Sequence, residues 1–365
     1  MAPALQYFYT VNLTDDSASN IVEGHAAVRS AARDTDNYSS NLMGDRDVRT
    51  YRQIPLELDP PRHHGFRTAL SPIFIKPTIE KLVPAFEEIA NNLVTDFIKK
   101  GGGDLVSQVA MPMVLKSLGV IYNRAQDVDE WASWGSDVWI TTPTGRTGAH
   151  LDKYLTRVFD EAETSDDDNV WKFVSKIEID GQPISRTEMY GIANVLLAGG
   201  RDTVIKLMTA MIWHLGNNAK DRKFLQENPE SVKTAISEVL RFVSPLPAME
   251  RAPASQKNLP DDQRNPDEYV RLSFASGNHD PEAFESPEVI DIHRARNPHL
   301  SFGFGPHTCI GNHVAELETL SLMKVFLARI KDWEISKDSE ITFTTVNKSV
   351  VPDRFHSLEV VVEKN

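Results

Sequence analysis

The sequence has little cysteine and no long apolar run, and both absences restrict where the protein can work. Its 365 residues include one cysteine, so no disulfide can form within the chain, and nothing calls for an oxidising compartment. Residues 1–16 show neither a basic start followed by an apolar core nor a run long enough to span a bilayer. We therefore expect a cytoplasmic protein without membrane insertion.

Positive charge is also scarce. Asp and Glu number 52 against 39 Lys and Arg, which gives a formal net charge of -13. Phosphate surfaces select for a basic face, so this balance argues against nucleic acid or an anionic membrane as a partner. Small molecules, or a protein with a local complementary patch, are the expected partners.

The chain also lacks internal repeats, long linkers and the GxGxxG fingerprint of a dinucleotide-binding domain. With a single cysteine, it has no set of Cys ligands for an iron–sulfur cluster. We interpret residues 1–365 as one domain with no fused reductase.

Helical periodicity dominates what is present. Ser185 and Glu188 have the spacing of a capping box and open an apolar-periodic stretch that predicts one long helix over 185–215. A cap residue, Asn228, precedes a second predicted helix, 229–242, which has a proline at its first position. A third predicted helix follows the cysteine loop and has an apolar stripe from Val314 to Ile330. Short strands are expected at 7–11, 269–274, 341–346 and 358–362. The predicted fold class is mainly α with small β-sheets.

The single cysteine, Cys309, lies in a glycine-rich loop, FGFGPHTCIG at residues 302–311. A lone cysteine is most often a small buried hydrophobe, but glycines here would let the backbone approach a flat, bulky group. Backbone N–H groups and the start of a following helix would stabilise a thiolate, which is a soft metal ligand. Zinc would need further Cys or His ligands at short spacing, and none accompany Cys309.

This loop matches every fixed position of the FGxGxHxCxG signature, and the sequence thereby resembles the cytochromes P450, the haem-thiolate monooxygenases. The resemblance implies the cytochrome P450 fold, in which a long central helix covers haem b. It makes Cys309 the axial iron ligand, whose electron donation favours O–O cleavage. It also implies that Phe302 shields the sulfur, that Gly303 and Gly311 lie at the haem, and that O2 is the co-substrate.

A second motif, GGRDT at residues 199–203, lies inside the predicted long helix. Glycine within a helix costs about 1 kcal/mol relative to alanine, which either tight helix packing or a function would explain. The segment resembles the family's oxygen-activating AGxDT. By that resemblance Gly199 and Gly200 leave room for O2, and the Thr203 hydroxyl bonds back to the Gly199 carbonyl. Asp202 and Thr203 would relay protons from solvent, as the family's pair does.

A third motif, ExxR, is formed by Glu238 and Arg241. Taken alone, such a helical pair is usually exposed and contributes about 0.3 kcal/mol. It is followed by NHDP at residues 278–281 and by Arg294, which resemble the family's meander. The resemblance gives Glu238, Arg241 and Arg294 structural roles in holding the haem-binding core.

The haem propionates would need cationic partners, because buried carboxylates are costly without them. DPPRHHGFR at residues 59–67 resembles the family's DPPxHxxxR segment, whose histidine and arginine lie one turn apart on a helix. The neighbouring His64 is interpreted as a surface residue from its spacing alone. The donors that the resemblance implies are His63, Arg67, Arg251 and His307.

Two features depart from the family pattern. Val314 and Glu316 stand where leucine and arginine are usual after the signature, and the N-terminus is shorter than usual. We expect part of the rim of the substrate channel to be built differently. Electrons would come from NAD(P)H through a separate ferredoxin and ferredoxin reductase, as the resemblance implies.

The substrate has no diagnostic motif. Residues 41–53 and 131–150 are rich in polar side chains, and the second range contains Trp131, Trp134 and Trp139. Aromatic platforms with polar donors suit a small polar substrate; the alternative is that the charges are solvated loop and the tryptophans are core. Our hypothesis is oxidative O-demethylation of a small O-methyl compound, such as a methylated sugar, which releases formaldehyde. Hydroxylation of an apolar substrate (a terpene, fatty acid or methoxyaromatic) and a non-catalytic haem-binding sensor are the alternatives.

Overall fold

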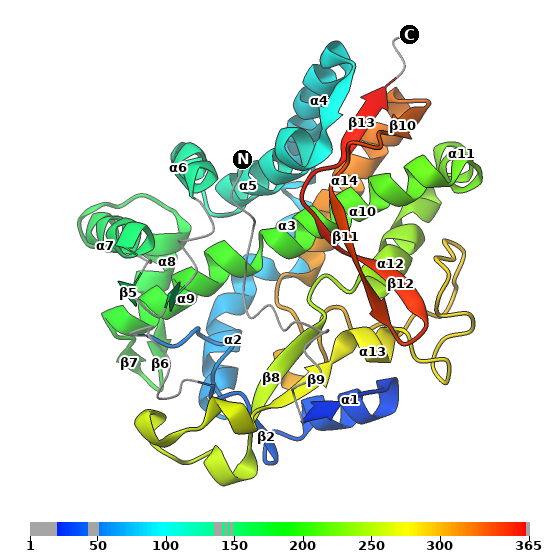
Figure 1. The fold of residues 1–365 in the computed structure, drawn as a ribbon. Helices are drawn as coiled ribbons and strands as arrows, with labels where there is room; N and C mark the ends of the chain where they lie inside the picture. Colours follow the sequence, from blue (N-terminus) through cyan, green and yellow to red (C-terminus); the bar gives the residue numbers. More distant parts are fainter. Residues whose placement is uncertain (1–19, 43–50, 135–140, 143–144, 147–148, 363–365) are drawn as a thin grey trace.

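Helices make up most of the structure, and small sheets lie beside them (Figure 1). This computed structural model describes residues 20–42, 51–134, 141–142, 145–146 and 149–362, so the strand expected at 7–11 lies outside it. The predicted fold class is confirmed. The α-helices are α1 (His25–Arg33), α2 (Arg62–Phe74), α3 (Lys76–Glu80), α4 (Val83–Lys100), α5 (Met111–Ile121), α6 (Val128–Ser133), α7 (Ala149–Thr164), α8 (Val170–Ser175), α9 (Arg186–Gly199), α10 (Asp202–Asn217), α11 (Ala219–Glu227), α12 (Val232–Val243), α13 (Phe274–Asn278) and α14 (Asn312–Arg329).

The strands form one four-stranded sheet, one three-stranded sheet and three two-stranded ribbons among the described residues. The four-stranded sheet has the order β1 (Ile21–Val22), β9 (Val270–Ser273), β8 (Ala248–Pro253) and β2 (Tyr38–Ser39). The three-stranded sheet has the order β10 (Trp333–Ile335), β13 (Glu359–Val362) and β3 (Gly102–Asp104). The ribbons are β11 (Ile341–Val346) with β12 (Ser349–Phe355), β4 (Thr141–Thr142) with β5 (Gly145–Arg146), and β6 (Glu178–Ile179) with β7 (Gln182–Pro183). The strands expected at 269–274, 341–346 and 358–362 are present as β9, β11 and β13.

The long helix predicted over 185–215 is two helices, α9 and α10, so the prediction of one helix is wrong. Its start is confirmed, because the Ser185 side chain accepts a hydrogen bond from the Glu188 N–H while the Glu188 carboxylate accepts from the Ser185 N–H. Gly200 ends α9, and Arg201 precedes α10. The apolar period continues across this point, which is why periodicity alone does not reveal the break.

Helix α10 crosses the middle of the molecule (Figure 1). It packs against α12, α14 and β10 and buries most of its residues. At its end Gly216 allows a close approach to β10, since a Cβ there would lie 2.8 Å from both Trp333 and Ile335. The Trp333 Nε1–H donates to the Ile212 carbonyl at 3.2 Å. The central helix is therefore fixed from several sides.

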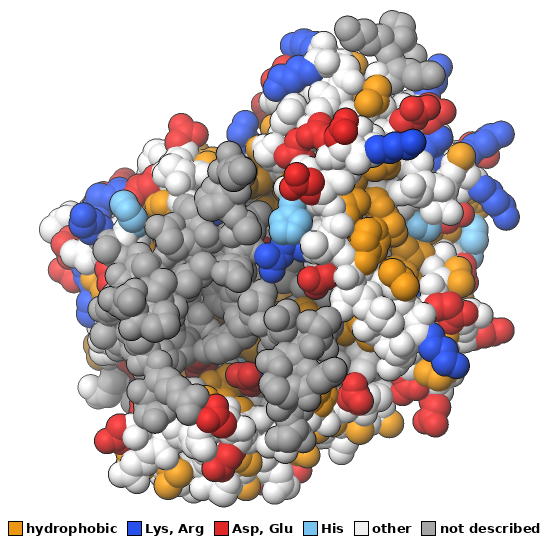
Figure 2. Space-filling model, in the orientation of Figure 1, with side chains coloured by type: hydrophobic (Ala, Val, Ile, Leu, Met, Phe, Trp, Pro, Cys, Tyr) orange, Lys and Arg blue, Asp and Glu red, His pale blue; other side chains and the backbone are white. Residues whose placement is uncertain are grey.

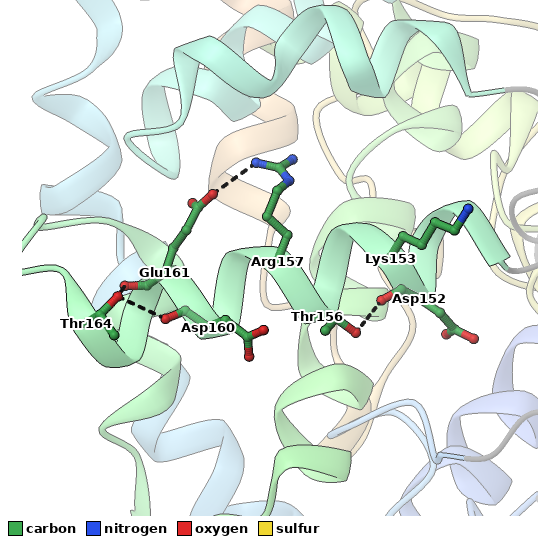
Figure 3. A pocket seen from close by; sticks show the side chains of 7 residues that line it. All are labelled: Asp152, Lys153, Thr156, Arg157, Asp160, Glu161 and Thr164. Carbon is green, nitrogen blue, oxygen red and sulfur yellow. Dashed lines mark hydrogen bonds and ion pairs between the residues drawn. The ribbon is translucent and has the colours of Figure 1, made fainter.

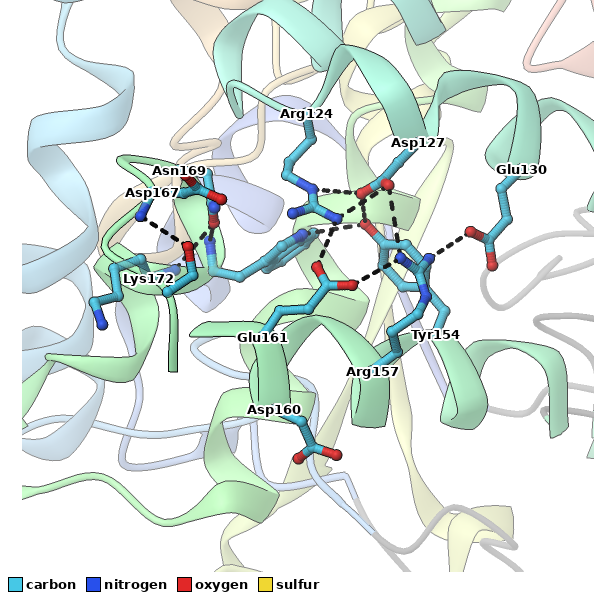
Figure 4. A network of polar contacts seen from close by, with 12 residues as sticks. Arg124, Asp127, Glu130, Tyr154, Arg157, Asp160, Glu161, Asp167, Asn169 and Lys172 are labelled. Atoms are coloured by element: carbon cyan, nitrogen blue, oxygen red, sulfur yellow. Dashed lines mark hydrogen bonds and ion pairs between the residues drawn. The ribbon is translucent and has the colours of Figure 1, made fainter. Parts of the chain in front are cut away.

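A buried polar network ties α6, α7 and α8 together (Figure 4). Arg124 donates from Nε to Asp127 Oδ2 at 2.6 Å, and the Tyr154 hydroxyl donates to the same oxygen at 2.7 Å. Trp171 completes the chain by donating from Nε1 to the Tyr154 hydroxyl at 3.1 Å. Buried ion pairs are favourable only when hydrogen bonds satisfy both partners, as they do here.

The tryptophans of this region belong to the core. Trp131 and Trp134 are 2% and 7% exposed, and their rings meet Tyr154 edge-on. The interpretation of these two as stacking platforms for a substrate is therefore wrong, and the alternative of core tryptophans holds. Trp139, like residues 43–50 of the polar segment, lies outside the described residues.

The surface carries both signs of charge. On the face shown in Figure 2, acidic and basic side chains are mixed over the described residues, and hydrophobic side chains gather to the right of centre, where Figure 1 places β11 and β12. Phe343 and Val350 of this ribbon are half or more exposed. Among the described residues of this face no continuous basic surface is seen, in agreement with the charge balance of the sequence.

Candidate functional site

One cavity of about 750 Å³ collects the residues that carry the motifs. It is lined by α2, by the segment between α9 and α10, by the loop before α14, and by β8, β11 and β12. Every residue that the sequence assigned to iron, oxygen or haem lines it: Cys309, Asp202, Thr203, His63, Arg67, Arg251, His307, Phe302, Gly303, Gly311, Gly199 and Gly200. Glu238, Arg241 and Arg294 are not among its lining residues.

Backbone hydrogen bonds shape the cysteine loop. Cys309 N–H donates to the Phe302 carbonyl at 2.7 Å, which closes the loop on itself. Gly303 and Gly305 have φ of 69° and 73°, a conformation that favours glycine. A Cβ on Gly305 would also lie 2.6 Å from the Ala32 carbonyl oxygen of α1. Two of the glycines are therefore needed for the path of the loop, whatever the cavity holds.

The thiol of Cys309 is exposed to the cavity. Burial raises its pKa, and this effect outweighs the Gly311 backbone N–H and the nearby positive charge of Arg67, which both lower it. The expected stabilisation of the thiolate by backbone N–H groups is present but insufficient within the protein alone. A cationic group in the cavity would supply the rest, because a thiolate that binds a metal loses its proton.

The four predicted propionate donors lie together. The rings of His63 and His307 are 4.1 Å apart. Burial lowers the pKa of His307, and the charges of Arg251 and Arg67 add to this effect. His307 Nε2 also forms a hydrogen bond with the Ser40 hydroxyl at 2.9 Å. His64, in contrast, is exposed and does not line the cavity.

Burial disfavours the charged forms of these donors. Burial lowers the pKa of Arg251 to about 10 and that of His63 to about 4, and it lowers the pKa of Arg67 as well. His63 Nε2 is buried with no hydrogen-bond partner among the described residues. A flat group with two carboxylates would satisfy these donors, and the thiol on the same cavity is a soft iron ligand. The residues present therefore fit haem b.

The break between α9 and α10 forms another wall of the cavity. The Thr203 hydroxyl donates to the Gly199 carbonyl at 3.4 Å, a long bond. Gly199 is open, since a Cβ there would meet only Val195 at 3.9 Å, whereas a Cβ on Gly200 would lie 3.3 Å from Leu118. The first glycine thus leaves space beside the helix, and the second allows packing against α5.

Asp202, next to Thr203, is a carboxyl that can exchange protons near neutral pH. Burial raises its pKa to about 6, although the charges of Arg201 and Arg354 lower it. Its Oδ1 lies 3.7 Å from Arg201 Nε and has no hydrogen-bond partner among the described residues. A carboxyl with such a pKa can both accept and release a proton at the pH of the cell.

The ExxR pair is buried, unlike an ordinary surface pair. Glu238 and Arg241 are both 0% exposed, and two N–H groups of Arg241 donate to the two carboxylate oxygens at 2.8 and 2.9 Å. Arg294 Nε and Asn297 Nδ2 donate to Glu238 Oε2 as well, at 2.9 and 3.1 Å. The cluster joins α12 to the segment that leads into the cysteine loop. Asn297 is a member that the motifs did not reveal.

Sequence reasoning also missed polar residues on the wall formed by α10 and the β11–β12 ribbon. Lys206, Thr342, Asp353, Arg354 and His356 line the cavity, beside Thr344 of a segment whose polarity is evident in the sequence. Lys206 follows Asp202 by four residues and so shares its face of the helix, which is the signal that could have found it. The residues of the ribbon carry no such signal, because their placement depends on long-range packing.

A second cavity, of about 790 Å³, lies along α7 and differs in kind (Figure 3). Its lining residues all come from this one helix. Arg157 donates to Glu161 at 3.2 Å and to Glu130 at 2.5 Å, so its charge is already compensated. We assign it no chemical role.

A family model matches the C-terminal part of the chain. Residues 214–353 match the model described as Cytochrome P450. Together with the relatives and solved structures that follow, this match supports the identification of the chain as a cytochrome P450. A "Probable cytochrome P450 127A1" of Sinorhizobium fredii is 28% identical over 340 residues, which cover 90% of this chain and 81% of that protein. A "Steroid C26-monooxygenase" of Mycobacterium tuberculosis is 26% identical over 330 residues, 87% of this chain and 88% of that protein.

Solved cytochrome P450 structures agree. One described as "The structure of a carbohydrate active P450" has a TM-score of 0.83 and 26% identity, and the match covers 94% of this chain and 92% of that one. The cytochrome P450 fold is therefore confirmed, and the protein is an O2-dependent monooxygenase, an oxidoreductase for which NAD(P)H dependence is typical of the family. No helix of the described residues is both long and apolar enough to cross a membrane.

Proposed function

We propose that this cytochrome P450 binds haem b through the thiolate of Cys309 and inserts one oxygen atom of O2 into a C–H bond of a small organic substrate. The observation that carries this proposal is the shared cavity. It is lined by the Cys309 thiol, by Asp202 and Thr203, and by the four side chains that can donate hydrogen bonds to carboxylates. When bound, the haem supplies the binding of O2 and the cleavage of its O–O bond, which electron donation from a thiolate favours. Phe302 limits access to the sulfur, and Gly303 and Gly311 leave room for the macrocycle.

The residues around the haem would each have a separate task. His63, Arg67, Arg251 and His307 bind the propionates and hold the group in one orientation. Glu238, Arg241 and Arg294 keep the cysteine loop in place from behind. One domain over residues 1–365 and a cytoplasmic location stay predictions from the sequence.

Asp202 and Thr203 would deliver protons from solvent. The carboxyl accepts a proton and passes it toward the Thr203 hydroxyl, which lies beside the open face of Gly199. Thr203→Ala should leave the fold intact and should raise the hydrogen peroxide released per NAD(P)H consumed, because loss of a proton-transfer group slows the productive step by about 100-fold or more. An unchanged peroxide yield in the reconstituted enzyme would count against this relay.

Electrons would come from NAD(P)H through a separate ferredoxin and ferredoxin reductase. The substrate would be a small polar O-methyl compound, such as a methylated sugar. The likeness to a carbohydrate active P450 supports this, and so do the hydroxyl and charged side chains that line the cavity on α10, β11 and β12.

The reaction balances as an oxidative demethylation. One C–H bond of the methoxy group becomes C–OH, the second oxygen atom leaves as water, and NAD(P)H supplies the two electrons. The resulting hemiacetal breaks its C–O bond to give the free hydroxyl and formaldehyde.

Ligand-induced changes in the haem spectrum test the substrate class. Holoenzyme titrated with methylated sugars, fatty acids, terpenes and methoxyaromatics should show a spin-state shift with the polar methyl ethers, and formaldehyde should form on turnover. A shift with apolar ligands alone would favour the alternative of an apolar hydroxylase. Absence of any oxidised product with ferredoxin, reductase and O2 would favour a haem-binding sensor.

A further inference from the structure

Two cationic side chains on the cavity wall are used by none of the motifs. Lys206 lies on α10 and Arg354 on β12, elements that pack against each other, and both residues line the cavity. Both are half-buried. Within the described residues neither side chain has a hydrogen bond or an ion pair.

Most other cations of comparable or greater burial outside the haem donors have an acidic partner; an exception is Arg29, whose guanidinium lies over the Phe304 ring. Arg241 and Arg294 bind Glu238, Arg124 binds Asp127, and Arg222 binds Asp332. The protein thus compensates buried positive charge where the scaffold allows it. Lys206 and Arg354 resemble the propionate donors instead, which are also left without acidic partners.

Burial makes these charges costly. It is the main reason that the pKa of Lys206 falls to about 8; the negative charge of Asp353 raises this pKa, and the positive charge of Arg354 has the smaller effect of lowering it. Asp353 is exposed and lies beyond 4 Å from the Lys206 ammonium, so it screens the charge only in part. Asp202 also lies on this wall, and the charge of Arg354 lowers its pKa, but no hydrogen bond or ion pair joins it to either cation among the described residues. Glu250, another acid of the cavity, faces Arg271 at 3.8 Å.

The position of the pair fits the substrate side of the site. Lys206 lies one helical turn beyond Asp202 and Thr203 on the same face of α10. Arg354 is directly opposite Thr342 in the β11–β12 ladder, and Thr342 also lines the cavity. An anion held here would lie beside the oxygen-activating segment, with a threonine hydroxyl at hand.

We propose that Lys206 and Arg354 form an anion-binding subsite, and that the substrate is a small O-methyl compound bearing a carboxylate. A guanidinium can bind a carboxylate through two parallel hydrogen bonds, and an ammonium adds a compact charge. The inference rests on the proposed function, because it specifies the substrate class of that same cavity. A methylated uronate is a compound of this class.

Matched ligand pairs test the subsite. Holoenzyme would be titrated, by spin-state shift and by calorimetry, with 4-O-methyl-D-glucuronate against 4-O-methyl-D-glucose, and with 4-methoxybenzoate against 4-methoxybenzamide. Within each pair the ligands differ in charge and share the methyl ether. We expect at least one acid to bind about tenfold more tightly than its neutral partner, the strength of one charge-assisted contact.

Variants assign the effect to the two residues. Lys206→Gln and Arg354→Gln should each weaken binding of the acid about tenfold and leave the neutral ligand within about twofold. Lys206→Arg should retain the preference for the acid. Lys223→Gln, at an exposed lysine of α11, is the matched control and should change neither. Equal haem content and an unchanged carbon monoxide spectrum of the variants exclude misfolding.

The outcomes separate the two proposals. Equal binding of acid and neutral ligand in both pairs, or an acid preference that survives both Gln variants, overturns the subsite. If the neutral sugar is demethylated and the variants change nothing, the proposed function stands and the subsite falls. If only the aromatic acid binds and both Gln variants weaken it, the subsite stands and the sugar hypothesis falls.

Discussion

The cysteine side of the cavity and the wall formed by α10 and β12 differ in whether their charged groups are hydrogen-bonded. Behind the cysteine loop, all five N–H donors of Arg241 are used, two on Glu238 and three on the carbonyls of Asn278, Pro287 and Val289. On the α10 wall, Asp202, Lys206 and Arg354 lack such partners among the described residues. Saturated groups hold the scaffold, and unsatisfied groups face the space where a ligand binds.

This contrast also separates two kinds of burial. In the Glu238 cluster every charge is hydrogen-bonded, which offsets the cost of burying it. The α10 wall keeps half-buried charges without such hydrogen bonds, and burial raises the pKa of Asp202 and lowers that of Lys206. The predictions that follow test whether the two regions respond to substitution as this difference requires.

The largest effect is expected in the saturated cluster. Glu238→Gln removes a buried charge and leaves Arg241 and Arg294 without their counter-ion, which should cost about 3–5 kcal/mol of folding free energy. We expect little haem-loaded protein and a large fall in melting temperature, measured by circular dichroism. Glu227→Gln, at an exposed glutamate of α11, is the control. A Glu238→Gln enzyme with unchanged stability and haem content would break the comparison.

The unsatisfied wall should respond in function and not in folding. Asp202→Asn should slow product formation about 100-fold, the lower range for loss of a general acid–base group. The same substitution should make the folded protein more stable. Burial gives the native Asp202 a pKa of about 6 against 3.8 ordinarily, so the native state holds this proton more tightly than the unfolded state.

The sign of the pH dependence follows. The contribution of Asp202 to stability is most favourable below its unfolded pKa and falls as pH rises toward 6. Asparagine never ionises, so the Asp202→Asn holoenzyme should gain on the wild type by the order of 1–3 kcal/mol between pH 4 and pH 8. Melting temperatures at several pH values measure this. A constant difference between the two proteins would show that the carboxyl does not titrate in this range.

The smallest expected effect is a difference in stability between alanine substitutions at Gly199 and at Gly200, at the break between α9 and α10. Gly199→Ala meets only an ordinary contact with Val195 and should stabilise α9 by about 0.5–1 kcal/mol, while slowing turnover because the new methyl group fills the open face. At Gly200 the contact with Leu118 is tighter, so alanine should bring less stability or none. Thermal melting and turnover of both holoenzymes decide. Greater stabilisation from Gly200→Ala would contradict the packing described.

The sequence predicted the saturated side better than the ligand-facing wall, and the reason is physical. The cysteine loop, the ExxR pair and the DPPRHHGFR segment depend on local spacing and on side chains that make specific contacts, so their residues lie where the motifs implied. The break at Gly200 and Arg201 leaves the apolar period intact, so the sequence does not reveal it. The sequence also does not distinguish whether Trp131 and Trp134 pack in the core or stack on a substrate.

Long-range packing accounts for what else was missed. Strand β12 contains Pro352 and charged residues, which weakens its strand signal, and it forms because β11 pairs with it and α10 packs against it. The placement of Arg354 near Lys206 follows from that packing alone. Asn297 joins Glu238 for a similar reason, since the chain returns to α12 from a distant segment.

The central claim is that the Cys309 sulfur binds haem iron, and the carbon monoxide spectrum of the reduced protein tests it most directly. The wild type should show the strongly red-shifted Soret band of a thiolate-ligated haem. Cys309→Ser, which preserves size and a polar atom, should lose this band even where it retains some porphyrin. The same red-shifted band, at equal haem content, in protein without that sulfur would contradict the account.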